Sequence, residues 1–259
     1  MWHVERIESA ILRPMEYRYD RIGMAYGRHR HGDPRIMRQI ARALGDVGSV
    51  VDVGAGTGVY SPVGPSVIAV EPSGVMIAQR PDEAAPVVRA LAGALPFPAG
   101  AFDAALATFT VHHWSDPTAG LREMRRVAAC QVVLTFDQDE EWLDEFWLTR
   151  DYLPEFAQLT QGVPTLAERA AAIGARLEVV PVPWDCADGF FHAYWRRPHA
   201  YLRPEVRRAT SVWARAGPAT EWRAIRELRN DLRTGRWARR NAGITRLDEM
   251  DLGARLLIT

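Results

Sequence analysis

The sequence feature that most constrains the fold is a valine-rich run at residues 50–53 that leads directly into a glycine-rich segment at residues 54–58. A second apolar run, at residues 67–70, ends in Glu71. Short apolar runs bounded by turn residues are typical of buried parallel strands. The carboxyl ends of parallel strands meet at one edge of a sheet, where open α/β folds bind their ligands. The sequence therefore predicts a parallel α/β fold with the glycines and Glu71 together at its binding edge.

Seven strands are expected along the chain. They lie at residues 50–53, 67–70, 87–90, 104–110, 132–136, 177–182 and 254–258. The spacing of apolar residues predicts helices at 34–44 and 117–129. Only eight residues, Pro62 and Pro65 among them, separate Gly58 from Val67. Because a parallel crossover usually takes about a dozen residues or more, we expect the first helix to shrink to a turn or to be replaced by a loop.

The composition changes after residue 136, and the chain is expected to have three parts. Seven of the nine tryptophans lie at or beyond Trp142. Residues 1–137 are expected to form the core with an N-terminal cap, and residues 138–175 a helical insert that is part of a lid. Residues 176–259 are expected to hold the last two strands around a second helical insert, at about 184–252. Proline breaks this second insert at Pro198, Pro204 and Pro218.

Composition and charge exclude several classes of function. The formal net charge is zero, so no global field draws the chain to nucleic acid or to an anionic membrane. No apolar run approaches the roughly 20 residues that span a bilayer, and residues 1–13 lack the apolar core of a signal peptide. Cys130 and Cys186 have neither metal-ligand nor disulfide spacing, and His29 and His31 lie too close in sequence to converge on a metal. We expect a cytoplasmic protein without a metal whose partner is a small molecule, and its oligomeric state is left open.

The glycine-rich segment is compatible with two nucleoside cofactors. Glycines let the backbone turn sharply and approach a ligand closely, because no Cβ stands in the way, and a carboxylate at Glu71 can accept both hydroxyls of a ribose. A dinucleotide site would need a third glycine where Val59 stands, and a helix whose N-terminus receives the pyrophosphate. Because that helix is expected to be truncated, the pattern favours S-adenosylmethionine, which carries no phosphate, over NAD.

Residues 50–58, 69–80 and 94–127 resemble successive motifs of the class I S-adenosylmethionine-dependent methyltransferases. The similarity is strongest to the broad bacterial group that acts on small molecules. It covers residues 19–136 well and extends more loosely to residues 146–154, 188–190 and the terminal strand. The resemblance implies a Rossmann-like, seven-stranded, mostly parallel sheet of order 3-2-1-4-5-7-6. In such a sheet the last strand is antiparallel, helices cover both faces, and helical inserts form a lid.

The resemblance also implies which residues hold the donor. Gly54 and Gly56 would face the methionine portion and the ribose, and Glu71 would hold the ribose hydroxyls. The full cofactor-binding set that it implies is Tyr19, Arg30, Asp52, Gly54, Gly56, Glu71, Pro72, Met76, Ala92 and Thr108. Arg28 or Arg30 would pair with the methionine carboxylate, the alternative for each being a solvated surface residue. Leu91 stands where the family often has an acidic residue for the adenine amino group, so backbone groups and packing must recognise the adenine here.

Methyl transfer is an in-line displacement, which positioning alone can accelerate. A general base helps only when the acceptor must lose a proton, and a histidine suits that task near neutral pH. His112 and His113 follow the fourth strand at the binding edge, and His113 is the candidate general base. The alternative is that either histidine packs structurally. Tyr26, Trp114 and Trp147 are the candidate substrate-binding residues.

The predicted function is transfer of a methyl group to a small organic acceptor, with S-adenosylhomocysteine as the product of the donor. The density of aromatic residues after residue 142 suits a lid over an apolar or aromatic molecule. An Arg-rich run at residues 203–240 is interleaved with Glu221, Glu227 and Asp231, which favours an ion-paired helix face over an anion-binding surface. The alternative function is a protein that binds the donor without transferring its methyl group.

Overall fold

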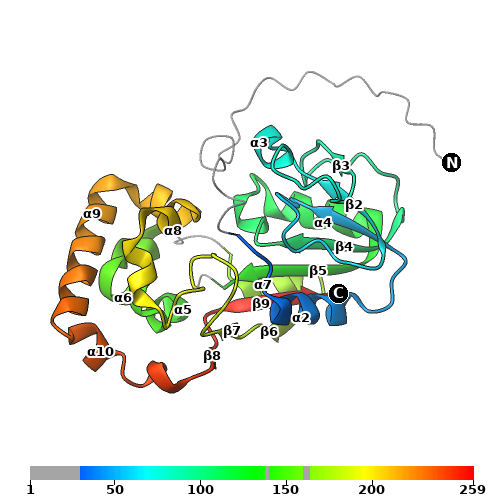
Figure 1. Ribbon diagram of the computed structural model, residues 1–259. Coiled ribbons are helices and arrows are strands. Elements are labelled where there is room, and N and C mark those ends of the chain that lie inside the picture. The colour runs from blue at the N-terminus through cyan, green and yellow to red at the C-terminus, as the bar shows by residue number, and fades with distance from the viewer. Residues whose placement is uncertain (1–29, 138–139, 160–163) are drawn as a thin grey trace.

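The computed structural model describes residues 30–137, 140–159 and 164–259, which form two lobes lying side by side (Figure 1). One lobe is built around a sheet with helices on both faces. The other consists of helices that come from two separate stretches of the chain, before and after the sixth strand of that sheet. Within the described residues, no helix is both long enough and apolar enough to cross a membrane.

A seven-stranded sheet forms the centre of the first lobe. Its strands are β1 Ser49–Val53, β2 Ser66–Val70, β3 Val87–Val88, β4 Phe102–Thr108, β5 Ala128–Phe136, β6 Arg176–Val179 and β9 Ala254–Ile258. Their order is β3-β2-β1-β4-β5-β9-β6. Neighbouring strands are parallel, except that β9 is antiparallel to both β5 and β6. The order expected from the sequence, and its one antiparallel strand, are confirmed.

Helices cover both faces of the sheet because successive strand residues point to opposite sides. Val50 packs with the buried face of α2 (Pro34–Leu44), whereas Val51 packs with α4 (Pro117–Val127) and α7 (Leu166–Ala172). Helix α7 therefore belongs to the sheet lobe, although it was expected within a lid insert.

The starts of the helices α2 and α4 are set by the same local chemistry. An aspartate, Asp33 or Asp116, precedes each helix and accepts a backbone N–H of its first turn at 2.9 Å. A proline follows as the first helical residue, where its missing N–H costs nothing.

The connections around the sheet differ from regular βαβ units. Residues 54–65, between β1 and β2, form a loop without a helix, as the short spacing predicted. A four-residue helix, α3 (Gly74–Ile77), follows β2. Strand β4 ends two residues earlier than expected because Phe109 has φ of 52°, a left-handed conformation, and η2 (Val111–His113) follows it. After Val179 the chain leaves the sheet, and β7 (Val182–Pro183) pairs with β8 (Glu249–Met250) in a second, two-stranded sheet.

The second lobe consists of short helices and one long one. Its elements are α5 Glu140–Glu145, α6 Trp147–Tyr152, η3 Pro154–Leu159, η4 Pro198–Leu202, α8 Pro204–Arg208, α9 Ser211–Arg233, α10 Arg236–Arg240 and η5 Ile244–Arg246. Pro198 and Pro204 begin their helices, as expected of proline. Pro218 instead lies inside α9, where the preceding Gly217 has φ of 82° and kinks the helix. We call this part of the molecule the helical lobe.

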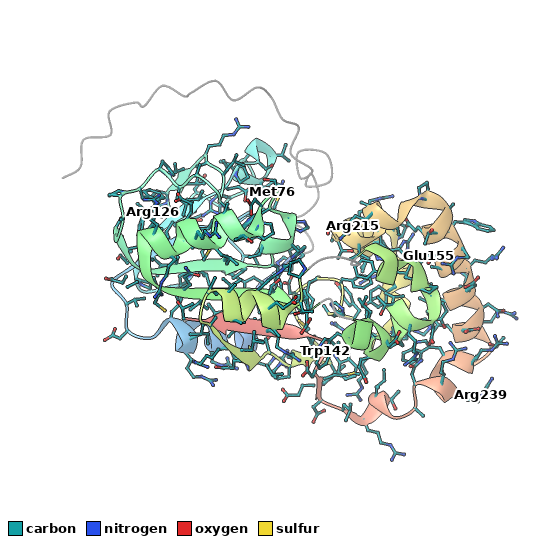
Figure 2. The ribbon with its side chains drawn as sticks, turned by 180° about the vertical axis from the view of Figure 1, so that it is seen from behind. Met76, Arg126, Trp142, Glu155, Arg215 and Arg239 are labelled. Carbon is teal, nitrogen blue, oxygen red and sulfur yellow. The ribbon has the colours of Figure 1, made fainter. Side chains whose placement is uncertain are left out.

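Charged residues on α9 form ion pairs, as the interleaved sequence indicated. Arg207 contacts Glu221 at 2.6 Å, and Arg223 contacts Glu227 one turn away at 3.2 Å. Asp231 is buried and accepts a hydrogen bond from the Tyr152 hydroxyl at 3.1 Å. In the view from behind, Trp142 lies where the two lobes meet and Arg215 lies in the helical lobe (Figure 2).

Candidate active site

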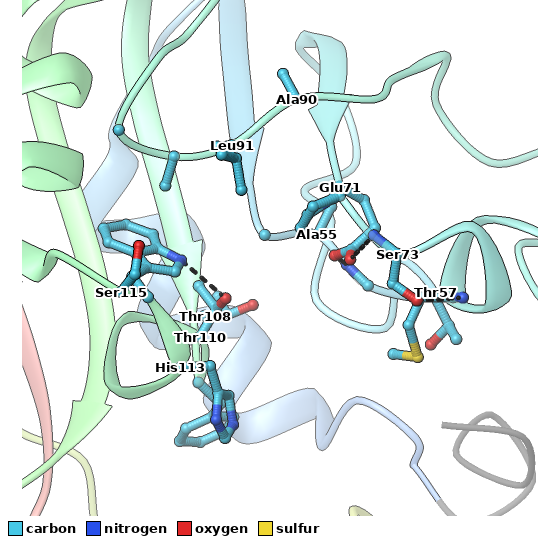
Figure 3. A pocket seen from close by; sticks show the side chains of 18 of the residues that line it. Ala55, Thr57, Glu71, Ser73, Ala90, Leu91, Thr108, Thr110, His113 and Ser115 are labelled. Atoms are coloured by element: carbon cyan, nitrogen blue, oxygen red, sulfur yellow. Dashed lines mark hydrogen bonds between the residues drawn. The ribbon is translucent and has the colours of Figure 1, made fainter. Parts of the chain in front are cut away.

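A cavity of about 550 Å³ opens at the carboxyl edge of the sheet. Its walls come from the β1–β2 loop, the end of β2, residues 90–94, the end of β4 and the turn η2. Glu71 and Ser73 lie on one side of it, and Thr108 and His113 lie on the other (Figure 3). We call this space the main cavity.

The carboxylate of Glu71 fastens the glycine loop to the end of β2. Its Oε2 accepts the backbone N–H of Gly56 at 2.9 Å, and its Oε1 accepts that of Ser73 at 2.9 Å. Burial raises the pKa of Glu71, and the two backbone N–H groups oppose that rise by favouring the charged form. Each carboxylate oxygen can accept a second hydrogen bond. Glu71 therefore positions the loop and still offers acceptors to a ligand.

Two glycines of the loop occupy positions that a larger residue would disturb. Gly54 has φ of 71° and Gly56 has φ of 55°. A Cβ on Gly54 would overlap Oγ1 of Thr110 and would lie 2.8 Å from its Cγ2, and a Cβ on Gly56 would lie 3.2 Å from Cε of Met76. Both contacts involve residues at the main cavity, so the glycines let the loop backbone form part of its wall.

Asp52 lies behind the glycine loop, bonds to Ser61 in the β1–β2 connection, and does not line the main cavity. It is 1% exposed, and its Oδ2 accepts a hydrogen bond from Oγ of Ser61 at 2.5 Å. Its Oδ1 is buried with no partner among the described residues. Burial raises the pKa of Asp52 to about 6. Arg80 lowers it in turn by its charge, and also donates to the Gly56 carbonyl at 3.0 Å.

Arg30 lines the main cavity and is held by a carboxylate that lies 158 residues further along the chain. Its Nε and Nη2 donate to the two oxygens of Asp188 at 2.6 and 2.9 Å. Asp188 is fully buried and also accepts the Tyr60 hydroxyl at 2.9 Å. A bidentate pair of this kind fixes the guanidinium in place. Arg30 therefore presents a positive charge of fixed orientation at the cavity wall.

The wall opposite Glu71 is formed where β4 ends. The left-handed turn at Phe109 places Thr110 and η2 at the cavity, and His113 lines it from η2. The indole N–H of Trp114 donates to Oγ1 of Thr110 at 3.2 Å, and its ring packs so closely on α4 that a Cβ on Gly120 would overlap it. A non-glycine residue in the left-handed region costs about 1–3 kcal/mol and is concentrated at functional sites.

A second, smaller cavity of about 70 Å³ adjoins the main cavity. The two share Arg30, Phe109 and His113 in their walls. The smaller one lies between the end of β5 and the helical lobe. Most of its walls are rings: Phe109, His112, His113, Phe136, Trp142, Phe156, Phe190, Phe191 and His192. We call it the aromatic annex.

Comparisons with known proteins agree with this geometry. A family model for the methyltransferase domain matches residues 51–135. A candidate methyltransferase from an antibiotic biosynthesis pathway in Anabaena variabilis is 32% identical in sequence. That similarity covers 89% of this chain and 98% of the other, with a TM-score of 0.77. The chain belongs to the class I S-adenosylmethionine-dependent methyltransferase family. The [4+2]-cyclase SpnF shares the fold at 17% identity and a TM-score of 0.50, over 93% of this chain and 92% of its own. No protein of curated function matches the sequence.

Membership of the methyltransferase family implies use of S-adenosylmethionine, and the residues of the main cavity fit that donor. Glu71 has acceptor sites that could hold ribose hydroxyls, and the left-handed Gly54 and Gly56 leave backbone open to close approach. Leu91 and Ala92 give the adjoining wall an apolar surface suited to a flat base. Within the described residues, no group of three or more His, Cys, Asp or Glu side chains is placed to hold a metal ion.

Most residues predicted for the methyltransferase site lie together at the main cavity. Its walls include Arg30, Gly54, Gly56, Glu71, Pro72, Met76, Ala92, Thr108, His113 and Trp114. Asp52 lies behind the glycine loop, and His112 lines the annex instead. Tyr19, Tyr26 and Arg28 fall outside the described residues.

The structure corrects the prediction for Trp147. Its side chain is 2% exposed, and its indole N–H donates to the Trp195 carbonyl at 2.6 Å within the helical lobe. It lines neither cavity. Aromatic content alone does not place Trp147 at the site, and this contact shows that it packs the core.

Several site residues were missed by reasoning from the sequence. Thr57, Ser73, Thr110 and Asp116, the last from the cap of α4, also line the main cavity. Asp116 could have been found, because an Asp-Pro pair before a helical pattern predicts a cap next to the end of β4. Phe109 carries no signal in the sequence for its left-handed backbone.

Proposed function

We propose that this protein transfers a methyl group from S-adenosylmethionine to a small, largely apolar organic acceptor. The observation that carries the proposal is the composition of the main cavity. One side offers the Glu71 carboxylate and the glycine loop, and the other offers His113, Trp114 and Phe109. A donor held by the first group would turn its reactive end towards the second, where an acceptor enters.

The chain's own residues would hold the donor and exclude water. Glu71 would accept hydrogen bonds from the ribose hydroxyls, and Arg30, locked by Asp188, would attract the methionine carboxylate. When bound, the donor supplies an electrophilic methyl group on a sulfonium. The protein then contributes by positioning, because holding the two reacting atoms in line removes much of the barrier.

His113 is proposed to accept a proton where the acceptor must lose one. It lines both the main cavity and the annex, so it lies beside any acceptor that spans them. Trp114, fixed by Thr110 and packed on α4, would form the floor under that acceptor. An acceptor that loses no proton would need only the positioning.

A second candidate is binding of the donor without methyl transfer. The fold similarity to a [4+2]-cyclase motivates it, because that protein's name states a different reaction on the same fold. Titration calorimetry separates the candidates. Binding of S-adenosylmethionine and S-adenosylhomocysteine below millimolar concentration, with no binding of NAD, is expected for both. Transfer of a labelled methyl group to compounds of a cell extract is expected only for the methyltransferase. If neither adenosyl compound binds, both candidate functions are refuted.

A further inference from the structure

Among the polar side chains of the aromatic annex that the proposed chemistry does not use, His192 is set among aromatic rings. His192 lines the annex from the segment between β7 and η4. Its ring lies against Phe136, Phe146 and Phe191, with centroids 4.6, 4.7 and 5.1 Å away. Its Nδ1 is buried with no hydrogen-bond partner among the described residues. Within the described part of the chain, one of the two imidazole nitrogens therefore lacks a hydrogen bond among the aromatic rings.

The surroundings keep this imidazole neutral. Burial lowers the pKa of His192 to about 3, because the charged form loses its solvation there. A neutral imidazole has one N–H and one lone pair. It can bind an uncharged polar group and offers no charge to an anion. Arg30 in the same wall is paired with Asp188 and is assigned to the donor's carboxylate, so it is not available to an anion in the annex.

An unpaired polar group in such a place is costly. A buried donor or acceptor without a partner costs about 1–3 kcal/mol, and most buried polar groups in proteins are therefore paired. A phenylalanine at position 192 would match the neighbouring rings and avoid that cost. The histidine becomes favourable where a ligand supplies the missing hydrogen bond. Ordered water could also supply the missing hydrogen bond.

We propose that the annex is the recognition pocket for the far end of the methyl acceptor, and that His192 hydrogen-bonds an uncharged hydroxyl group on it. This inference rests on the proposed function. The annex volume of about 70 Å³ is small. Because that is about an eighth of the main cavity's volume, the annex takes only a small substituent. The acceptor's apolar body would lie along Phe109 and His113, which both cavities share, and its methylated atom would face the main cavity.

The charges around the annex support an uncharged group over an anionic one. Arg215 lines the annex from α9, but Asp137 lines it too and would repel a carboxylate or phosphate. Arg30 is the remaining cation in the wall, and its guanidinium lies over the Phe109 ring at 5.9 Å, paired with Asp188. With Arg30 committed to Asp188 and to the donor, Arg215 and Asp137 leave the annex no net charge with which to select an ion.

The test uses two probes that differ by one hydroxyl, benzyl alcohol and ethylbenzene. Their binding to the protein saturated with S-adenosylhomocysteine is measured by ligand-observed NMR. We expect benzyl alcohol to bind wild type about tenfold more tightly than ethylbenzene, and His192→Phe to abolish that ratio while ethylbenzene binds as before or more tightly. His199→Phe makes the same change at an exposed position outside both cavities and should leave the ratio unchanged.

The outcomes distinguish a His192 that recognises the hydroxyl group from one that only packs the core or binds water. A ratio near one in wild type, or an equal loss of both probes in the variant, would overturn the proposal, since water or packing would then account for His192. The unfolding midpoint of His192→Phe is expected to equal or exceed that of wild type, because an unpaired polar group is removed. Should that variant misfold, His192→Leu gives the same comparison. Donor binding is measured separately, so failure of S-adenosylhomocysteine to bind would refute the proposed function, and loss of the hydroxyl preference alone would refute only this inference.

Discussion

Replacing Gly54 with alanine tests whether close backbone approach at the glycine loop shapes the donor site. The position has φ of 71°, and an added Cβ would overlap Oγ1 of Thr110 and lie 2.8 and 2.9 Å from its Cγ2 and Cβ. Two costs therefore add. A left-handed backbone costs an L-residue about 1–2 kcal/mol, and overpacking costs about 1–3 kcal/mol.

Gly100 provides the matched control. Its φ is 65°, close to that of Gly54, but a Cβ there would meet nothing within 4 Å. Gly100→Ala therefore carries the backbone cost alone. Because 1 kcal/mol shifts the unfolding midpoint of a chain of this size by about 2–4 °C, we expect losses of about 3 °C for Gly100→Ala and about 9 °C for Gly54→Ala.

The overlap also predicts a selective effect on the donor. Gly54 and Thr110 both line the main cavity, whereas Gly100 does not. Gly54→Ala should weaken S-adenosylhomocysteine binding at least tenfold in calorimetry, and Gly100→Ala should leave it unchanged. Adding Thr110→Ala to Gly54→Ala removes the two nearest atoms and should restore part of the lost stability, a coupling that a double-mutant cycle measures. Equal effects of the two glycine substitutions on both stability and affinity would refute the reasoning.

Three further substitutions test other parts of the site. Glu71→Gln should weaken S-adenosylhomocysteine binding about 10- to 100-fold, because an amide cannot accept from both backbone N–H groups that the carboxylate holds; unchanged affinity in calorimetry would contradict the assignment. His113→Ala should slow methyl transfer about 100-fold or more with donor affinity unchanged if it accepts a proton, whereas an unchanged rate would leave it a packing residue. The pKa of Asp52 rises from 3.8 to about 6 on folding, so between these pH values the folded state binds more protons than the unfolded state. The free energy of unfolding of the wild type therefore falls by up to about 3 kcal/mol as the pH rises through this range. Asp52→Asn should gain in unfolding midpoint relative to wild type across that range, and parallel pH curves for the two proteins would contradict the shift.

Much of the fold could be predicted because its signals are local. The bounds of α2 match the predicted 34–44, since Asp33 and Pro34 mark its start and the apolar spacing marks its buried face. The sheet order followed from the family resemblance, and the missing first helix followed from counting residues between Gly58 and Val67. In each case a few neighbouring residues carry the information.

The predictions that failed depend on which surface a side chain meets. Trp147 and Trp142 are both aromatic residues near the start of the helical lobe, yet Trp147 is buried against Trp195 whereas Trp142 lines the annex. Composition cannot distinguish them, because tertiary packing alone decides which ring faces inward. The end of β4 was misplaced for a similar reason, since Phe109 is driven into a left-handed conformation that its type does not favour.

The two sides of the methyltransferase cavity differ in how the chain encodes them. On the donor side, Glu71 bonds to Gly56 and Ser73, which lie 15 and 2 residues away. Arg30, which is also assigned to the donor, is instead held by Asp188 across 158 residues, and Asp188 also bonds to Tyr60 across 128 residues. The Glu71 part of the donor site can therefore be recognised from one stretch of sequence. The annex forms only where the helical lobe meets the sheet, so its lining can vary without changing the Glu71 part of the donor site, whereas a change at Asp188 would disturb Arg30. That separation explains why the sequence identifies the donor while the acceptor must be sought in the packing around the annex.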